Sequence, residues 1–173
     1  MSCIPNAPIA FDVRDDGWQS FTGVLTTTAA QWKPISTEVL VFEGVVETES
    51  QAAILRQLEL EETATSSGNL KFQDLMVYLY TQASPTVPTE GVVYNPSTTN
   101  LVAQVKVLST DYLRKSDTVW TARVNPDKYF TTGSGATAGN LYAVALYANA
   151  TPTAYAASAG IRVKVHVENN AVV

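Results

Sequence analysis

The sequence contains one cysteine, one histidine and few charged residues, and each shortage removes a class of site. Cys3 is the only cysteine in 173 residues, so the chain has neither an internal disulfide nor a thiolate cage for a metal ion. His166 is the only histidine, which leaves a single candidate for the base of a Ser-His or Cys-His pair. Charged residues make up 16% of the chain, against roughly 25% in an average soluble protein. This composition favours sheets and packed surfaces over long solvated helices.

Long apolar runs are also missing. No run approaches the roughly 20 residues of a membrane span, and the opening residues lack the basic start and the apolar core of a signal peptide. We therefore expect a soluble intracellular product, or one that enters an assembly by a route other than secretion.

The charge that is present is negative overall and unevenly distributed. A net charge of −5 and a pI near 4.8 argue against direct nucleic-acid binding, because such binding depends on Lys and Arg that neutralise phosphates. Residues 1–90 carry four Lys/Arg against twelve Asp/Glu, a net of −8, whereas residues 91–173 carry seven against four, a net of +3. If the two halves reach different faces of the fold, head-to-tail packing of copies is favoured.

Short segments rich in apolar and β-branched residues recur along the chain and predict strands. We expect strands at residues 11–13, 21–27, 38–47, 70–81, 100–108, 118–125, 140–148 and 159–170. Eight or nine strands in one domain of this length predict an all-β fold, a two-sheet β-sandwich of the single jelly-roll type that spans residues 1–173. Long loops and at most one or two short helical turns complete it.

Two segments carry mixed signals. Residues 50–62 are good helix formers with a candidate capping box, yet Leu58, Glu59, Leu60 and Glu61 alternate and the surrounding chain is β. We favour a strand there and keep a helix as the alternative. Residues 125–130 offer Asn125 as a cap and Pro126 at the first helical position, which predicts a short helical turn.

The closing strand decides what His166 does. Ile161, Val163, Val165 and Val167 alternate with a polar set that comprises Arg162, Lys164, His166 and Glu168. His166 therefore shares the polar face of a strand, and no GxSxG elbow accompanies it. We interpret it as an exposed or rim residue and predict no catalytic residues.

Carboxylates and tryptophans offer two further candidates. Asp12, Asp15 and Asp16 cluster before a glycine, but their spacing does not fit an EF-hand loop, so we interpret them as a turn and expect no metal site. Glu59 and Glu61 would share one strand face, as in glycosidases that use paired carboxylates, although a solvated face is the simpler interpretation. Trp18, Trp32 and Trp120 would suit a sugar-binding module, but Trp120 alternates within a strand as a core residue does.

Three stretches carry a resemblance to a known family: "DLMVYLYTQASPTVPTEG", "NLYAVALYANATPTAYAAS" and "IRVKVHVEN". With them the chain resembles single jelly-roll viral capsid proteins, most of all the small major capsid protein of tailless, internal-membrane icosahedral bacteriophages of the Thermus type. The resemblance implies a virion protein assembled in the host cytoplasm, with upright jelly rolls, a second, larger capsid protein as partner and an underlying lipid vesicle. It implies no catalytic residues and no cofactor. The low charge departs from the pattern expected of a thermophile's protein.

The amino-terminal residues suggest a role in assembly. The stretch "IPNAP" is too rich in proline for the inside of a sheet, so residues 1–13 are a candidate arm that reaches a neighbouring subunit of a homo-oligomer. The alternative function is a carbohydrate-binding or receptor-binding β-sandwich module.

Overall fold

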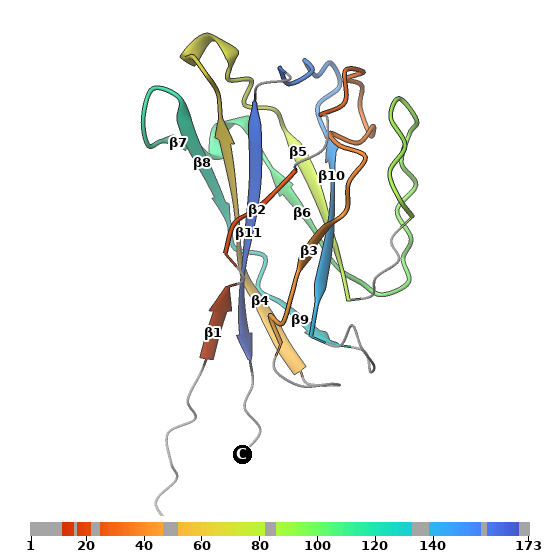
Figure 1. The fold of residues 1–173 in the computed structure, drawn as a ribbon. Coiled ribbons are helices and arrows are strands. Elements are labelled where there is room, and N and C mark those ends of the chain that lie inside the picture. Colours follow the sequence, from red (N-terminus) through yellow and green to blue (C-terminus); the bar gives the residue numbers. More distant parts are fainter. Residues whose placement is uncertain are drawn as a thin grey trace, which may run out of the picture.

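In the computed structural model, two antiparallel sheets pack face to face (Figure 1). The structure describes residues 12–15, 17–21, 25–46, 52–81, 86–132, 139–156 and 159–169. Helix in these residues is confined to two 3-10 turns, η1 (Ser67–Asn69) and η2 (Ser109–Asp111). Among the described residues, no helix has the length and apolar character needed to cross a membrane.

The larger sheet has the strand order β1-β11-β4-β8-β7, with β2 paired to β11 and β9 paired to β4. Its strands are β1 (Asp12–Asp15), β2 (Gln19–Ser20), β4 (Ala52–Thr63), β7 (Tyr112–Arg114), β8 (Val119–Val124), β9 (Lys128–Thr131) and β11 (Gly160–Asn169). The smaller sheet has the order β3-β10-β5-β6. Its strands are β3 (Leu40–Phe42), β5 (Leu75–Tyr80), β6 (Leu101–Val107) and β10 (Leu141–Tyr147).

The pairing is nested along the chain. The first strands, β1 and β2, pair with the last, β11; β3 pairs with β10; β4 pairs with β8 and β9; and β5 pairs with β6. A long hairpin of this kind, rolled up so that β11 also meets β4 and β10 also meets β5, is a jelly roll. The predicted all-β sandwich of the single jelly-roll type is confirmed.

The core lies between the sheets, and the strands that contribute to it show two patterns of burial. On β11, the predicted stripe of Ile161, Val163, Val165 and Val167 is fully buried. On β10 every residue is buried, because the outer face of this strand is covered as well as the inner one. A strand that is covered on one face, such as β11, alternates apolar and polar residues. A strand that is covered on both faces, such as β10, is apolar throughout.

The ambiguous segment at residues 50–62 is a strand. β4 lies in the middle of the larger sheet, where it pairs with β11 over nearly its whole length and with β8 and β9 on the other side. Helix propensity amounts to less than about 1 kcal/mol per residue, so a central position with two sets of ladder hydrogen bonds overrides it.

The predicted helical turn at residues 125–130 is wrong. Residues from Lys128 onward form β9, which pairs with the first residues of β4. Asp127 adopts a left-handed conformation with φ of 45°, which turns the chain from β8 into β9 and prevents a helical continuation.

Several predicted strands were placed correctly but with wrong ends. The strand expected at 38–47 stops at Phe42, because Gly44 has φ of 62°, and that at 70–81 begins only at Leu75, after Phe72 at φ of 47°. Of residues 21–27, the described ones contribute only a single bridge, from Leu25 to Ser36. The strand expected at 11–13 is found at Asp12–Asp15. Residues 1–11 of the candidate arm lie outside the described residues.

Candidate functional site

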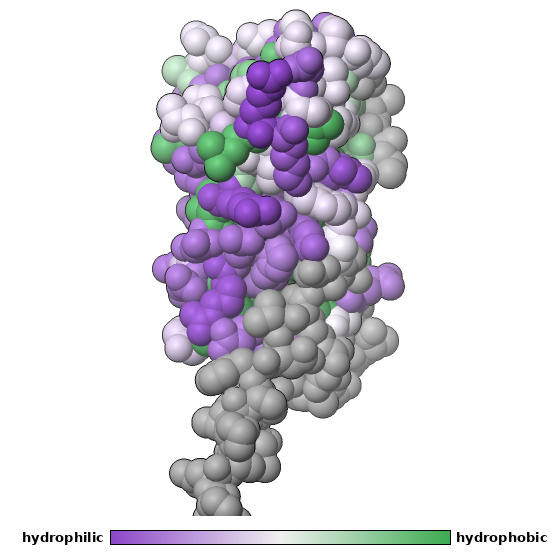
Figure 2. Space-filling view, turned by 90° about the vertical axis from the view of Figure 1, so that its left-hand side faces the viewer, coloured by the Kyte–Doolittle hydropathy of each residue, from purple (hydrophilic) through white to green (hydrophobic). Residues whose placement is uncertain are grey.

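Most of the charged side chains that pair with one another lie on the outer face of the larger sheet. This side is turned to the viewer in Figure 2, where the described surface is mostly hydrophilic. The polar set on β11 points to this face, opposite the buried valines, as predicted. His166 is part of it, with a side chain 22% exposed and its Nε2 3.7 Å from Oε1 of Glu59. It is a partly buried residue within the polar face, paired with β1 on one side and β4 on the other, with Glu59 and the half-exposed Arg56 and Gln57 around it.

Glu59 and Glu61 share this face but are not solvated. The register places Arg162 of β11 opposite Glu61 and Arg123 of β8 opposite Glu59. Arg123 Nε lies 2.9 Å from Glu59 Oε1, and Arg162 Nε donates to Glu61 Oε1 over 3.1 Å. Their longer side chains cover the carboxylates, which are only 8% and 3% exposed. The interpretation as a solvated face is therefore wrong: these are buried carboxylates under partly exposed cations.

Trp18 extends this arrangement outward. Lys115 Nζ lies 3.4 Å from Glu61 Oε2, and both Lys115 and Arg162 stand over the Trp18 ring, 5.6 and 5.3 Å from its centroid. The two cations are thus held between a buried carboxylate and an aromatic face, which fixes their position. We call the group of Glu59, Glu61, Lys115, Arg123, Arg162 and Trp18 the charged layer.

A second polar group lies near the other end of the same face. Arg56 pairs with Glu168 and, over 3.0 Å, with Asp127, and these two carboxylates raise the pKa of the guanidinium above its usual range. Gln57 donates to Asn125 over 3.0 Å. Arg56, Gln57, Asn125, Asp127 and His166 line a shallow depression of about 350 Å³. Its polar groups bond to one another, so it is a rigid part of the face.

The two sequence halves meet within this face. Acidic residues of β4 come from the first half, and the Arg and Lys residues that pair with them come from the second half. The fold therefore interleaves the halves on the larger sheet, and the expected separation into acidic and basic ends does not occur there.

Glu62 is an acidic site that the sequence did not reveal. It follows Glu61 on β4 and so points inward, where it is fully buried. Its carboxylate accepts hydrogen bonds from the backbone N–H groups of Lys71 and Phe72, at 2.6 and 3.0 Å, and burial raises its pKa. It thereby anchors the loop before β5. The only sequence signal was that two adjacent Glu residues in a strand must face opposite sides.

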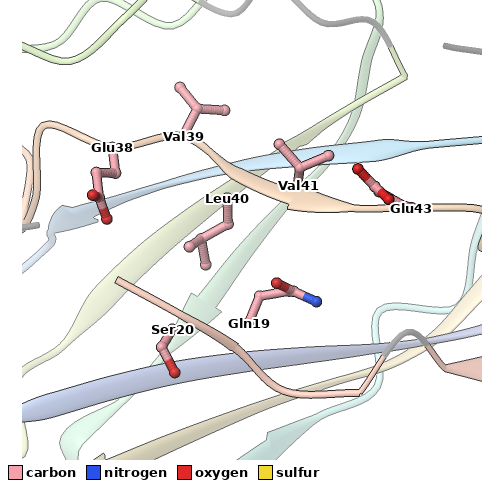
Figure 3. Close-up of a pocket in the computed structure, with 7 residues that line it drawn as sticks. All are labelled: Gln19, Ser20, Glu38, Val39, Leu40, Val41 and Glu43. Carbon is pink, nitrogen blue, oxygen red and sulfur yellow. The ribbon is translucent and has the colours of Figure 1, made fainter. Parts of the chain in front are cut away.

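A groove opens where the edges of the two sheets meet at β2 and β3. Its volume is about 600 Å³, and it is lined by Gln19, Ser20, Glu38, Val39, Leu40, Val41 and Glu43. Figure 3 shows Leu40 pointing toward β2, Val39 and Val41 on the far side of β3, and a glutamate near each end of the segment. We call it the acidic groove.

The tryptophans, which as an alternative would suit a sugar-binding module, do not form one platform. The three tryptophans lie apart: Trp18 is covered by cations, Trp120 packs against Phe72 at a centroid distance of 4.7 Å, and Trp32 is 39% exposed on a turn. Among the described residues, no group of three or more His, Cys, Asp or Glu is placed to hold a metal ion. Cys3, Asp16 and the side chains of Asp12 and Asp15 lie outside the described part.

Comparisons with known proteins add little to this geometry. No protein-family model matches the chain, and no curated protein matches it. A solved structure, "Structure of Triatoma Virus (TrV)", is matched at 9% identity with a TM-score of 0.19. That match covers 94% of this chain, which spans 62% of the length of the matched chain, and a similarity this low carries no inference about function.

Proposed function

We propose that this protein is a structural virion protein, a capsid subunit that assembles with copies of itself into an icosahedral shell. The observation that carries the proposal is the nested strand pairing of a single jelly roll, an architecture found in viral capsid and lectin domains. Because a fold alone does not define a function, the choice between these two uses rests on the surface.

The surface favours assembly over sugar binding. A sugar platform needs an exposed aromatic face, and of the three tryptophans Trp18 and Trp120 are occupied by cations and by Phe72. The charged side chains of the charged layer pair with one another across neighbouring strands, and these pairs make the outer face of the larger sheet rigid. A subunit of a shell needs rigid faces, and the paired charges of this layer support that use.

The finer form of the proposal follows the sequence resemblance. The subunit would act in virions of the tailless, internal-membrane bacteriophage type, together with a second, larger capsid protein and above a lipid vesicle. Assembly would take place in the host cytoplasm. No catalytic residue, metal or cofactor takes part.

The experiment is an assembly assay on the full chain. Purified protein is concentrated at low and moderate salt and followed by analytical ultracentrifugation and electron microscopy. We expect oligomers and regular sheets or particles whose amount rises with concentration. A protein that stays monomeric under all conditions contradicts the proposal.

The alternative, a carbohydrate-binding module, has one structural observation in its favour, the exposed ring of Trp32. Tryptophan fluorescence titrated with a glycan panel tests it. Saturable quenching that Trp32→Ala removes, in a protein that remains monomeric, would replace the capsid proposal.

A further inference from the structure

Three exposed valines lie on the loop between β5 and β6, outside the smaller sheet. Val87, Val92 and Val93 are 67%, 55% and 51% exposed, whereas the neighbouring Tyr94 is buried in the outer apolar cluster of that sheet. The three valines and Tyr94 line a hollow of about 230 Å³, and its other lining residues are Thr86, Thr89 and Asn95. Apolar residues together with uncharged polar ones are typical of the centre and the rim of a protein interface.

Trp32 lies beside this hollow and is held there by its backbone. Its carbonyl oxygen accepts a hydrogen bond from the N–H of Tyr94 over 2.9 Å, and its N–H donates to the carbonyl of Tyr147 over 2.8 Å. Trp32 has φ of 64°, a left-handed conformation that is strained for a bulky residue, and it is 39% exposed. Strain of this kind persists where the surrounding structure fixes it, often at functional positions. We call Trp32, Val87, Val92 and Val93 the apolar patch.

The hollow offers no charge to a ligand. Its lining residues are all uncharged. Glu90 is the only charged residue between Thr86 and Asn95, and its Oε1 accepts hydrogen bonds from the N–H and the hydroxyl of Thr27, both over 2.9 Å. An ionic ligand would therefore lose its hydration without gaining a counter-charge in the hollow, so an apolar occupant fits better.

We infer that the apolar patch is a two-fold contact between two copies of the chain, in which Trp32 of each copy enters the valine-lined hollow of the other. This inference rests on the proposed function, for which it names a contact surface. The hollow is smaller than the roughly 300–1,000 Å³ of small-molecule sites, so it suits a single large side chain. Each copy carries the aromatic side chain and the hollow next to each other, so one two-fold axis between the copies fills both hollows.

The apolar patch would form the centre of this interface and not the whole of it. A stable interface buries about 800 Å² per partner, which is more than four side chains expose. Tryptophan is the residue type most enriched among the few anchors that carry most of the binding energy, and surrounding residues exclude water from them. Trp32 is thus expected to carry the largest share. A two-fold contact closes at two copies, so a shell would grow from dimers through other surfaces.

The test is sedimentation equilibrium of the full chain at several protein concentrations. We expect Trp32→Ala to weaken dimer formation at least about tenfold, because the anchor is lost on both sides of the two-fold axis. Val93→Lys should weaken it as well, because it places a charge in the hollow. Association of the wild type should not weaken when the salt concentration is raised, since screening acts on charged contacts and not on apolar ones.

Matched controls come from two exposed residues of the larger sheet. Tyr129→Ala removes an aromatic side chain from a residue that is 74% exposed, and Leu113→Lys introduces a charge at an apolar position that is 70% exposed. These residues lie on β9 and β7, away from the apolar patch, so both variants should dimerise like the wild type. Circular dichroism checks that each variant is folded, and Val93→Ser replaces Val93→Lys if that variant unfolds.

Fluorescence gives a second measurement that uses the unaltered chain. Trp32 leaves water when dimers form, so its emission should shift to shorter wavelength and acrylamide should quench it less as the protein concentration rises. Trp32→Ala should abolish this dependence on concentration. Emission of the wild type that does not change while dimers form would contradict the burial of Trp32 in the contact.

The outcomes separate this inference from the proposed function. If the wild type does not associate at all, the proposed function fails and this inference fails with it. If the wild type associates and Trp32→Ala and Val93→Lys associate equally well, only the contact through the apolar patch is overturned. Flotation of the wild type with phosphatidylcholine vesicles, lost in both variants while association is kept, would assign the patch to a lipid surface and would also overturn the contact.

Discussion

The outer faces of the two sheets are covered by different kinds of side chain. The larger sheet covers itself with the charged layer, in which buried carboxylates lie under cations from neighbouring strands. The smaller sheet covers itself with a second apolar cluster, which contains Tyr78, Tyr80, Tyr94, Tyr142, Val144 and Leu146. Part of that cover comes from the loop after β5: Tyr94 packs into the cluster while its N–H donates to the carbonyl of Trp32 over 2.9 Å. Figure 1 shows this light-green segment outside β5 and β10.

The difference indicates that the cover of the smaller sheet contributes stability and that the cover of the larger sheet provides a polar surface. An apolar cover adds a hydrophobic core outside the sandwich and fixes the loop that supplies it. A charged cover adds little net stability, since the gain from ion pairs is largely offset by the loss of hydration, but it keeps an outer face polar and rigid. Substitutions on the outer face of the smaller sheet should therefore cost more than those on the outer face of the larger sheet.

The largest effect is expected for Leu146→Ala. Leu146 is fully buried in the outer cluster, on β10 opposite Met76 of β5. Removing its side chain should lower the free energy of unfolding by about 3 kcal/mol, the usual cost of a buried Leu-to-Ala change. Guanidinium unfolding followed by tryptophan fluorescence measures it. Leu58→Ala, equally buried between the sheets, is the reference. A loss below about 1 kcal/mol for Leu146→Ala alone would mean that the outer cluster is no core.

A smaller effect is expected for Glu61→Gln in the charged layer. The change leaves Arg162 and Lys115 without their shared carboxylate, but both cations are 40% or more exposed and regain water. We expect a loss of about 1 to 2 kcal/mol, between the values for buried and surface pairs. The control is Asp117→Asn, which breaks the exposed pair with Arg114 and should change stability by less than about 0.5 kcal/mol. Equal losses for both variants would contradict the distinction between buried and exposed pairs.

Glu62→Gln sharpens the comparison with a carboxylate that faces the interior. Burial raises the pKa of Glu62 in the folded state above that in the unfolded chain, so the folded state holds this proton more tightly. Its contribution to stability is therefore fully present below the ordinary Glu pKa and is lost as the pH rises through the raised folded pKa. The wild type should gain stability relative to Glu62→Gln on acidification through this window. Unfolding curves of both proteins at several pH values measure the difference, and a gap that stays constant with pH would exclude the effect.

The sequence predicted what depends on local pattern and missed what depends on register. The strands at Leu101–Val107, Val119–Val124, Leu141–Tyr147 and Gly160–Asn169 lie within one residue or so of their predicted ends, because alternation or continuous apolarity marks them. The side of the sheet to which Glu59 and Glu61 point also followed from alternation. Their burial did not, because it depends on β8 and β11 placing Arg123 and Arg162 opposite them.

The errors have the same origin. Asn125 and Pro126 carry a genuine local signal for a helix start, but the ladder between β9 and β4 competes with that turn and wins. The acidic groove could not be predicted either, since it is formed by the edges of two sheets that meet only in the folded chain.

The smallest effect is expected for His166→Ala, although His166 is the only histidine and so the only candidate for a catalytic base of a Ser-His or Cys-His pair. His166 shares Glu59 with Arg123, whose Nε is closer to that carboxylate than His166 Nε2, at 2.9 against 3.7 Å. Removing the imidazole therefore leaves Glu59 with its main cation, and stability should change by no more than about 0.5 kcal/mol, as for most substitutions at partly exposed positions. The neighbouring Val165→Ala, on the buried side of the same strand, should cost about 2 kcal/mol. Because the His166 side chain is only 22% exposed and lies between β1 and β4, its removal should also leave self-association unchanged. A loss of association without a loss of stability would instead place a contact between copies on the outer face of the larger sheet, because His166 lies on that face.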